Sequence, residues 1–245
     1  SYKLLLNPDG GNVGIGTTTP ATELDVSGTI TATGLTVPGD SLITDSDIPH
    51  NTFLGLGAGI TNTGASNTGL GHNALRISTG GSNTAIGWGT LTNNTTGSQN
   101  TAVGNSALQN NTTGVFNTAL GLGALKDNTE GDRNTATGYT ALRNNTTGIG
   151  NVANGWGALA GNTTGGQNHA IGYNSLVSNT AGSGNCTLGG GTLNKNIDGD
   201  YNIAIGHAAL RDKTAGDYNI AIGSGAMQFT EDANNNIAAG RSALP

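Results

Sequence analysis

Apolar and polar residues recur with a fixed step from residue 51 to residue 245. Each repeat opens with Asn, at Asn51, Asn67 and Asn83 and then every 17 residues from Asn100 to Asn236. The repeats follow the approximate pattern Asn-Thr-Ala-Ile-Gly-x-x-Ala-Leu-x-Asn-Asn-Thr-Thr-Gly-x-x, with positions numbered from the opening Asn. A fixed internal period predicts a solenoid, in which like repeats stack as successive coils.

Each coil is expected to contain short strands and turns. The period is too short for a helical hairpin, and the Gly at position 5 would weaken a helix. We predict one extended stretch at positions 2 to 4 and another around positions 7 to 9, so that stacked coils form parallel sheets. The Gly at position 5 and the Gly of the Asn-Asn-Thr-Thr-Gly turn are predicted to take backbone angles unfavourable for other residues. This turn Gly is Gly97, Gly114, Gly131, Gly148, Gly165, Gly182, Gly199 or Gly216.

The apolar positions predict a thin core. Side chains alternate across a strand, so positions 2 and 4 share one face and position 3 takes the other. Position 4 is mostly large and apolar, position 9 is mostly Leu, and position 3 is mostly Ala. With about two large apolar residues per coil, a single roll has little core of its own. Packing several copies around an axis would supply the missing burial.

The opening Asn side chains are expected to form amide ladders between coils.

Two further segments precede the repeats. Residues 1 to 37 are expected to form a small β stalk or collar, with strands at residues 2 to 6, 12 to 16 and within 23 to 37. Residues 38 to 50 lack periodicity and are expected to be a linker. The β-roll repeat domain then spans residues 51 to 245.

Two stretches resemble known families. The Asn-x-Ala-Ile-Gly step resembles the left-handed β-roll head of trimeric autotransporter adhesins, whose usual coil is shorter. The segment from Gly11 to Thr17, then Pro20 and the run from Leu24 to Ile30, is similar to the stalk of many bacteriophage tail fibres. The resemblance implies an all-β homotrimer on a virion tail fibre or a cell surface, attached to a host glycan or protein receptor.

Composition limits the other possibilities. The net charge of -6 disfavours nucleic acid as a partner. The longest apolar run near the start is Leu4-Leu5-Leu6, so neither membrane insertion nor a signal peptide is expected there. Cys186 cannot form an intrachain disulfide, because it is the single cysteine, and it is expected to be a small buried residue.

Aromatic residues gather at position 6. Trp88, Tyr139, Trp156 and Tyr173 all follow the position-5 Gly. Because stacked coils align like positions, the last three are expected to form a flat strip suited to sugar faces or apolar ligand patches. The alternative is that the rings only pack together or shield a corner.

Position 4 turns polar at Thr137 and Asn154, in adjacent coils. If this column points toward an axis shared by several chains, the polar groups could hold water or an ion there. The alternative, which we favour, is a local slip that leaves the column partly solvated.

The acidic residues are not expected to be catalytic. Paired carboxylates could serve glycoside hydrolysis, as in a glycan-degrading tailspike, but none pair in columns that would line a cleft. The run from Asp198 to Asn202 makes Asp198 and Asp200 a weak calcium candidate. The Thr row at position 2 could suggest ice binding, but it stops at Val152. We therefore expect no enzyme, no cofactor and no other metal site.

Two function classes remain. The first is a homotrimeric extracellular fibre of a phage or phage-like particle that binds a host receptor. The second is the head of a bacterial trimeric surface adhesin. The stalk-like segment favours the fibre, whereas a signal peptide and a C-terminal anchor in the full gene would favour the adhesin.

Overall fold

The computed structural model describes residues 13–15, 24–26, 50–229 and 234–244. The chain divides into two units, residues 1–42 and residues 43–245. In the first unit, β1 (Val13–Ile15) and β2 (Leu24–Val26) pair in parallel, and both fall within predicted strands. The rest of the predicted stalk, and the linker apart from residue 50, lie outside the described residues.

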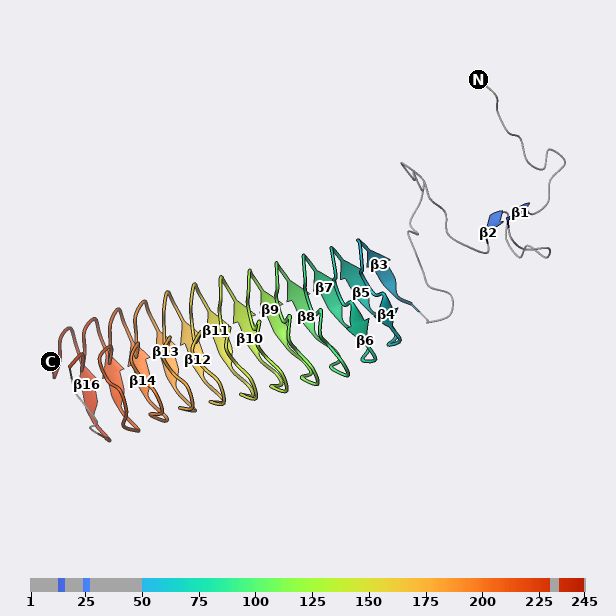
Figure 1. Ribbon diagram of the computed structural model, residues 1–245. Helices are drawn as coiled ribbons and strands as arrows, with labels where there is room; N and C mark the ends of the chain where they lie inside the picture. Colours follow the sequence, from blue (N-terminus) through green and yellow to red (C-terminus); the bar gives the residue numbers. More distant parts are fainter. Residues whose placement is uncertain (1–12, 16–23, 27–49, 230–233, 245) are drawn as a thin grey trace, which may run out of the picture. The chain divides into compact units, whose positions relative to one another are not determined.

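The second unit is a parallel β-solenoid, as predicted (Figure 1). Twelve strands form one parallel sheet with one three-residue strand per coil, always at positions 2 to 4. Neighbouring strands pair position for position; Thr135, for example, lies opposite Val152. A second sheet of two short strands, β4 (Thr61–Asn62) and β6 (Ile77–Ser78), lies in the first two coils. The strands of the long sheet are β3 (Thr52–Leu54), β5 (Thr68–Leu70), β7 (Thr84–Ile86), β8 (Thr101–Val103), β9 (Thr118–Leu120), β10 (Thr135–Thr137), β11 (Val152–Asn154), β12 (His169–Ile171), β13 (Cys186–Leu188), β14 (Ile203–Ile205), β15 (Ile220–Ile222) and β16 (Ile237–Ala239).

The predicted second strand at positions 7 to 9 is wrong, because this stretch forms tight turns. In one coil, Gly123 and Leu125 take φ angles of 65° and 51°, in the left-handed region. The Gly123 amide donates to Asn105 O in the preceding coil (2.9 Å), and the Leu125 amide donates to Ala141 O in the next coil (3.0 Å). The alternating directions keep the coils bonded to both neighbours without an extended strand.

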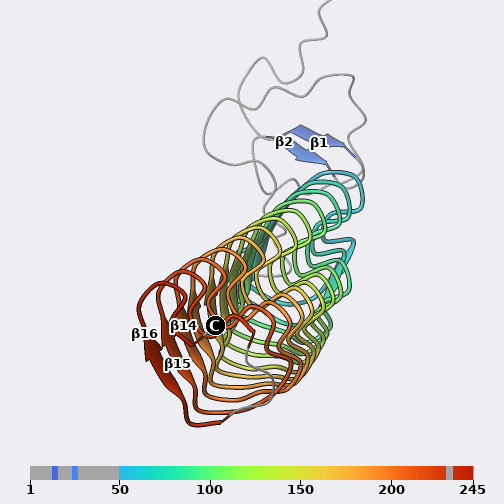
Figure 2. The same ribbon diagram turned by 90° about the vertical axis from the view of Figure 1, so that its left-hand side faces the viewer.

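The core inside each coil is narrow and made of small residues. Ala at positions 3 and 8 and Leu at position 9 are fully buried, as at Ala136, Ala141 and Leu142. Viewed obliquely along the stack, successive coils repeat the same looped outline, each displaced from the one before (Figure 2). Positions 2 and 4 point outward, so the large apolar residues at position 4 are only partly covered within one chain; Leu120 and Leu188 are each 49% exposed. Cys186, at position 2, is likewise exposed, which corrects the prediction that it is buried.

Two ladders of buried asparagines run along the stack. The predicted ladder of opening asparagines is present: Asn134 N donates to Asn117 Oδ1 (3.0 Å), and Asn134 Nδ2 donates to Gly148 O (2.8 Å). Position 12 forms a second ladder that the sequence analysis missed. Asn145 Nδ2 donates to Asn128 Oδ1 (2.7 Å) and also to Gly148 O (3.0 Å). The turn-Gly carbonyls from Gly97 to Gly199 therefore accept from both ladders, which satisfies amides that would be costly to bury unpaired.

The two glycine columns serve different purposes. Position 5 takes the predicted left-handed angles, as at Gly138 with φ 134°. The prediction for the turn Gly is wrong at seven of its eight positions, since only Gly216, with φ 101°, is left-handed. The turn Gly is required for space instead. A Cβ on Gly131 would lie 2.5 Å from both Asn128 Oδ1 and Gly148 O, in the path of the ladders.

One ion-pair cluster joins two neighbouring coils. Asp212 lies 2.8 Å from Lys195 Nζ, one coil back, and 2.9 Å from Arg211 Nη2. The hydrogen bond from Lys195, followed by that from Arg211, lowers the pKa of the Asp212 carboxyl below its usual value. The ionised form of Asp212 is therefore favoured in the folded chain.

Replacing one ladder asparagine should destabilise the solenoid strongly. Asn145→Ala removes two donated bonds and leaves Asn162 Nδ2 without the acceptor that it meets at 2.8 Å. We expect a loss of about 2 to 4 kcal/mol in the free energy of unfolding, measured by urea denaturation. Asn144→Ala, which changes an exposed side chain next to it, is the matched control and should cost under about 0.5 kcal/mol. Equal effects would show that the ladder adds no special stability.

Asp212→Asn should alter the pH dependence of stability. Because the folded-state pKa is lowered, the contribution of Asp212 is present above its unfolded pKa of about 3.9 and is lost as the pH falls through the folded-state value. The parent chain should therefore be slightly more stable than the variant at pH 7, and the difference should shrink as the pH falls below the unfolded pKa of about 3.9. Thermal unfolding at a series of pH values measures this, and a difference that grows on acidification would contradict it.

Candidate functional site

The aromatic residues at position 6 form an exposed stack. The rings of Tyr139 and Trp156 lie 5.6 Å apart with an interplanar angle of 11°, and those of Trp156 and Tyr173 lie 5.0 Å apart at 14°. The three residues are 47%, 48% and 61% exposed. Each follows the left-handed Gly at position 5, and the strand register places them on successive coils. We call Tyr139, Trp156 and Tyr173 the aromatic strip.

The fourth aromatic candidate, Trp88, lies elsewhere. It stacks on His72 with ring centroids 6.1 Å apart, and two coils separate it from the strip. Leu122, which the sequence analysis did not single out, occupies position 6 immediately before Tyr139 and is 49% exposed. The strip therefore continues as an apolar surface over one more coil. The sequence could have indicated Leu122 through its place at position 6, which it shares with the aromatic residues although it is not aromatic itself.

A small hollow borders the beginning of the strip. Its volume is about 270 Å³, and Leu122, Tyr139, Lys126 and Arg143 contribute to its lining. Hydroxyl and amide groups of Asn105, Ser106 and Thr140 complete it. A ligand lying on the aromatic strip would thus find hydrogen-bond donors and acceptors beside the rings, which is the arrangement that orients a sugar.

The polar pair of position 4 lies on the outer face of the sheet. Thr137 is half-buried and Asn154 is exposed, between Leu120 and Ile171 in the same column. Within one chain both side chains meet solvent. Their convergence on a shared axis therefore stays a prediction about an assembly of several chains.

At the calcium candidate residues, Asp side chains accept hydrogen bonds from backbone amides of the preceding coil. Asp200 Oδ1 accepts a hydrogen bond from Ser183 N (2.6 Å), and Asp200 N in turn donates to Asp217 Oδ1 (2.8 Å). Asp198 is exposed beside them, and the three carboxylates line an open hollow of about 380 Å³. Across residues 50–229 and 234–244, no group of three or more His, Cys, Asp or Glu side chains is arranged to hold a metal ion.

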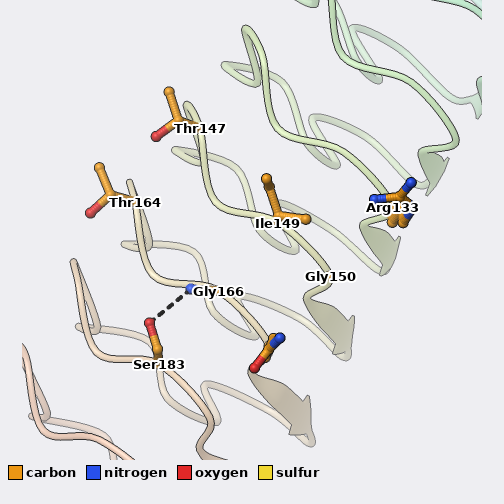
Figure 3. Close-up of a pocket in the computed structure, with 8 residues that line it drawn as sticks. Arg133, Thr147, Ile149, Gly150, Thr164, Gly166 and Ser183 are labelled. Atoms are coloured by element: carbon orange, nitrogen blue, oxygen red, sulfur yellow. Dashed lines mark hydrogen bonds between the residues drawn. The ribbon is translucent and has the colours of Figure 1, made fainter.

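A larger hollow, which the sequence analysis missed, lies near the ends of four successive coils. It has a volume of about 520 Å³ and is lined by side chains at positions 14, 16 and 17 (Figure 3). Its cause is the absence of side chains at Gly150 and Gly166, which interrupts two columns that carry side chains in most other coils. Gly150 and Gly166, which lie in adjacent coils, could have indicated this hollow from the sequence. The lining residues are Arg133, Thr147, Ile149, Gly150, Thr164, Gly166, Gln167 and Ser183.

Comparison with protein-family models, with curated protein sequences and with solved structures found no match to this chain. In the part of the chain that the structure describes, no helix is long and apolar enough to cross a membrane. Any statement of function therefore depends on the geometry of these surfaces.

Proposed function

We propose that this chain forms the shaft of a homotrimeric extracellular attachment fibre of a phage or phage-like particle, and that the shaft binds a glycan on a host surface. The aromatic strip is the observation that carries the proposal. The binding is non-catalytic and uses no cofactor. Nucleic acid is not a partner, in keeping with the net charge of -6.

The strip suits a sugar because its rings are held rigidly while they remain exposed. The rings stack on one another, so their edges form the exposed contact surface, and the hydrogen-bonded coils hold this surface in place at low conformational cost. The adjoining hollow places Lys126 and Arg143 where they can donate to hydroxyl groups of a ligand on Tyr139. A solenoid built of twelve strands about 4.8 Å apart carries this surface on a rod roughly 55 Å long.

The outer face of the sheet supports self-association. Toward the C-terminal end, both outward columns are apolar, and Ile203, Ile205, Ile220 and Ile222 lie together on β14 and β15. The whole face is a strip roughly 55 Å long and about 10 Å wide, so its area is of the order buried per partner in a stable interface. The position-4 column is apolar along most of this face, and exposed apolar strips mark interaction surfaces. Three chains meeting through this face would also bring the three copies of Thr137 together at one level and those of Asn154 at the next level.

Loss of the central ring of the strip should weaken glycan binding. In a screen of host-surface glycans, the chain should bind at least one, and Trp156→Ala should reduce the affinity for it about 3-fold to 10-fold, because the central ring edge of the contact surface is lost. Trp88→Ala, in the same column but away from the strip, should change the affinity by less than about 2-fold. If no glycan binds, or if the two variants behave alike, the strip is not the receptor site.

The oligomeric state tests the proposed fibre. Light scattering should give three times the chain mass of 24.3 kDa. The double variant Ile205→Asp and Ile222→Asp, on the outer sheet face, should give the mass of one chain while circular dichroism keeps its β signature, because buried carboxylates oppose association. The control Ile197→Asp changes an exposed apolar residue in a turn and should remain trimeric. A parent mass of one chain would exclude the homotrimer.

A further inference from the structure

The hollow beside Arg133 lies where a regular capping pattern is broken. At position 16, the backbone N–H of one coil usually donates to a side-chain oxygen at position 16 of the next coil. Val115 N donates to Asp132 Oδ1 (2.8 Å), and Gly166 N donates to Ser183 Oγ (3.1 Å, dashed in Figure 3). The same pattern continues from Ser183 to Asp200 and from Asp200 to Asp217. The capping oxygen is a carboxylate oxygen at three of six places and otherwise belongs to Ser98, Ser183 or Asn234. Within the described coils, Ser98 N and Asp132 N are uncapped because Val115 and Ile149, in the next coils, carry no side-chain oxygen.

Ile149 N lacks this cap because the next coil has Gly166 in place of an oxygen-bearing side chain. Among the described residues, no acceptor for Ile149 N is present. A Cβ atom added to Gly166 would lie 3.7 Å from Ile149 N, so the missing side chain would have begun within reach of this amide. The N–H group therefore faces the space that the hollow occupies, and an oxygen placed there by a ligand would complete the column.

A cation lies at one end of the same hollow. The Arg133 guanidinium is 5.9 Å from the centre of the Phe116 ring, which orients it, and it forms no ion pair within the described part of the chain. A guanidinium binds a carboxylate through two parallel hydrogen bonds, and this is among the strongest contacts available to an exposed side chain. Arg133 and the uncapped Ile149 amide together favour an anionic oxygen ligand.

The remaining lining fits a ring that carries hydroxyl groups. The Ile149 side chain is 48% exposed and offers an apolar surface. Thr147 and Thr164 supply hydroxyl groups, and Gln167 supplies an amide. A volume of about 520 Å³ is within the range of small-ligand sites. A sugar ring presents both an apolar face and several hydroxyl groups, whereas an isolated inorganic anion would leave the apolar surface unused.

We propose that this hollow binds an acidic sugar unit, with its carboxylate between the Arg133 guanidinium and the Ile149 amide in the place of the side chain that Gly166 lacks. The inference refines the proposed attachment function and rests on it, by naming an acidic glycan as the ligand at a second site. The site shares no residue with the aromatic strip, so each can be lost without the other.

The test uses the full chain and a tetramer of galacturonic acid, with the fully methyl-esterified tetramer as the neutral probe. Titration calorimetry should detect binding of the acid and at least 10-fold weaker binding of the ester. Arg133→Gln should weaken binding of the acid at least 10-fold, while Arg76→Gln, a matched loss of charge on an exposed side chain in an earlier coil, should leave it within 2-fold. Equal binding of both probes, equal effects of the two Arg variants, or no binding of the acid would overturn the proposal.

Gly166→Asp supplies the missing carboxylate from the chain itself. Its Cβ would lie 3.0 Å from Ile149 O, a tight contact, but the same column accommodates Asp132, Asp200 and Asp217 in other coils. We expect the variant to lose binding of the acidic tetramer and to unfold at a higher temperature than the parent, because the Ile149 amide becomes capped. Retained binding with a raised unfolding temperature would overturn the proposal.

The two proposals fail in different ways. Trp156→Ala should leave the affinity for the acidic tetramer unchanged, and it should lower the affinity for the glycan that occupies the aromatic strip. If the acidic tetramer does not bind but Trp156→Ala still weakens glycan binding, the proposed acidic-sugar site is contradicted and the aromatic strip is not. If the acidic tetramer binds but no glycan binds the aromatic strip, the proposal for the strip is contradicted and the acidic-sugar site is not.

Discussion

The two buried asparagine ladders, which meet at the turn-Gly carbonyls from Gly97 to Gly199, are the interaction on which the rest of the solenoid depends. A coil buries only one large apolar residue and two alanines, so apolar burial alone fixes the position of a coil weakly. Each amide, by contrast, must find its acceptors at one spacing. Asn134 N reaches Asn117 Oδ1, and Asn145 Nδ2 reaches Asn128 Oδ1, in the preceding coil only when the two coils stack in register. Buried amides that are costly when unpaired therefore set the register that the thin core leaves loose.

Strict register turns each sequence position into a surface column. Since every strand pairs with the next position for position, a residue type that recurs at one position becomes a ladder on the outside. Tyr139, Trp156 and Tyr173 stack for this reason, without a pocket or any long-range fold to bring them together. The same rule explains the hollow beside Arg133, where glycines leave two columns empty. The scaffold is constant, and its candidate binding surfaces arise from local departures in the columns.

The two large apolar columns differ in how deeply one chain buries them. Position 9 is covered within the coil, whereas position 4 points away from it and stays partly exposed on the outside of the chain. Leu142 is fully buried, but Leu188 stays 49% exposed, although both belong to apolar columns of similar regularity. The division follows from the alternation of side chains in a strand, because Ala at position 3 takes the inner side and forces position 4 outward.

The sequence by itself determined the class of fold. Its period predicted a parallel solenoid with a strand at positions 2 to 4, the left-handed glycines at position 5, the ladder of opening asparagines and the column of rings, since each follows from like residues at like positions. Only the tertiary structure decided how each coil closes. The left-handed turns at positions 7 and 9, the second ladder and the spatial role of Gly131 depend on contacts across the coil that no spacing along the chain reveals. The uncapped Ile149 amide is of the same kind, because it depends on the missing side chain of Gly166, 17 residues away in the sequence and adjacent in space.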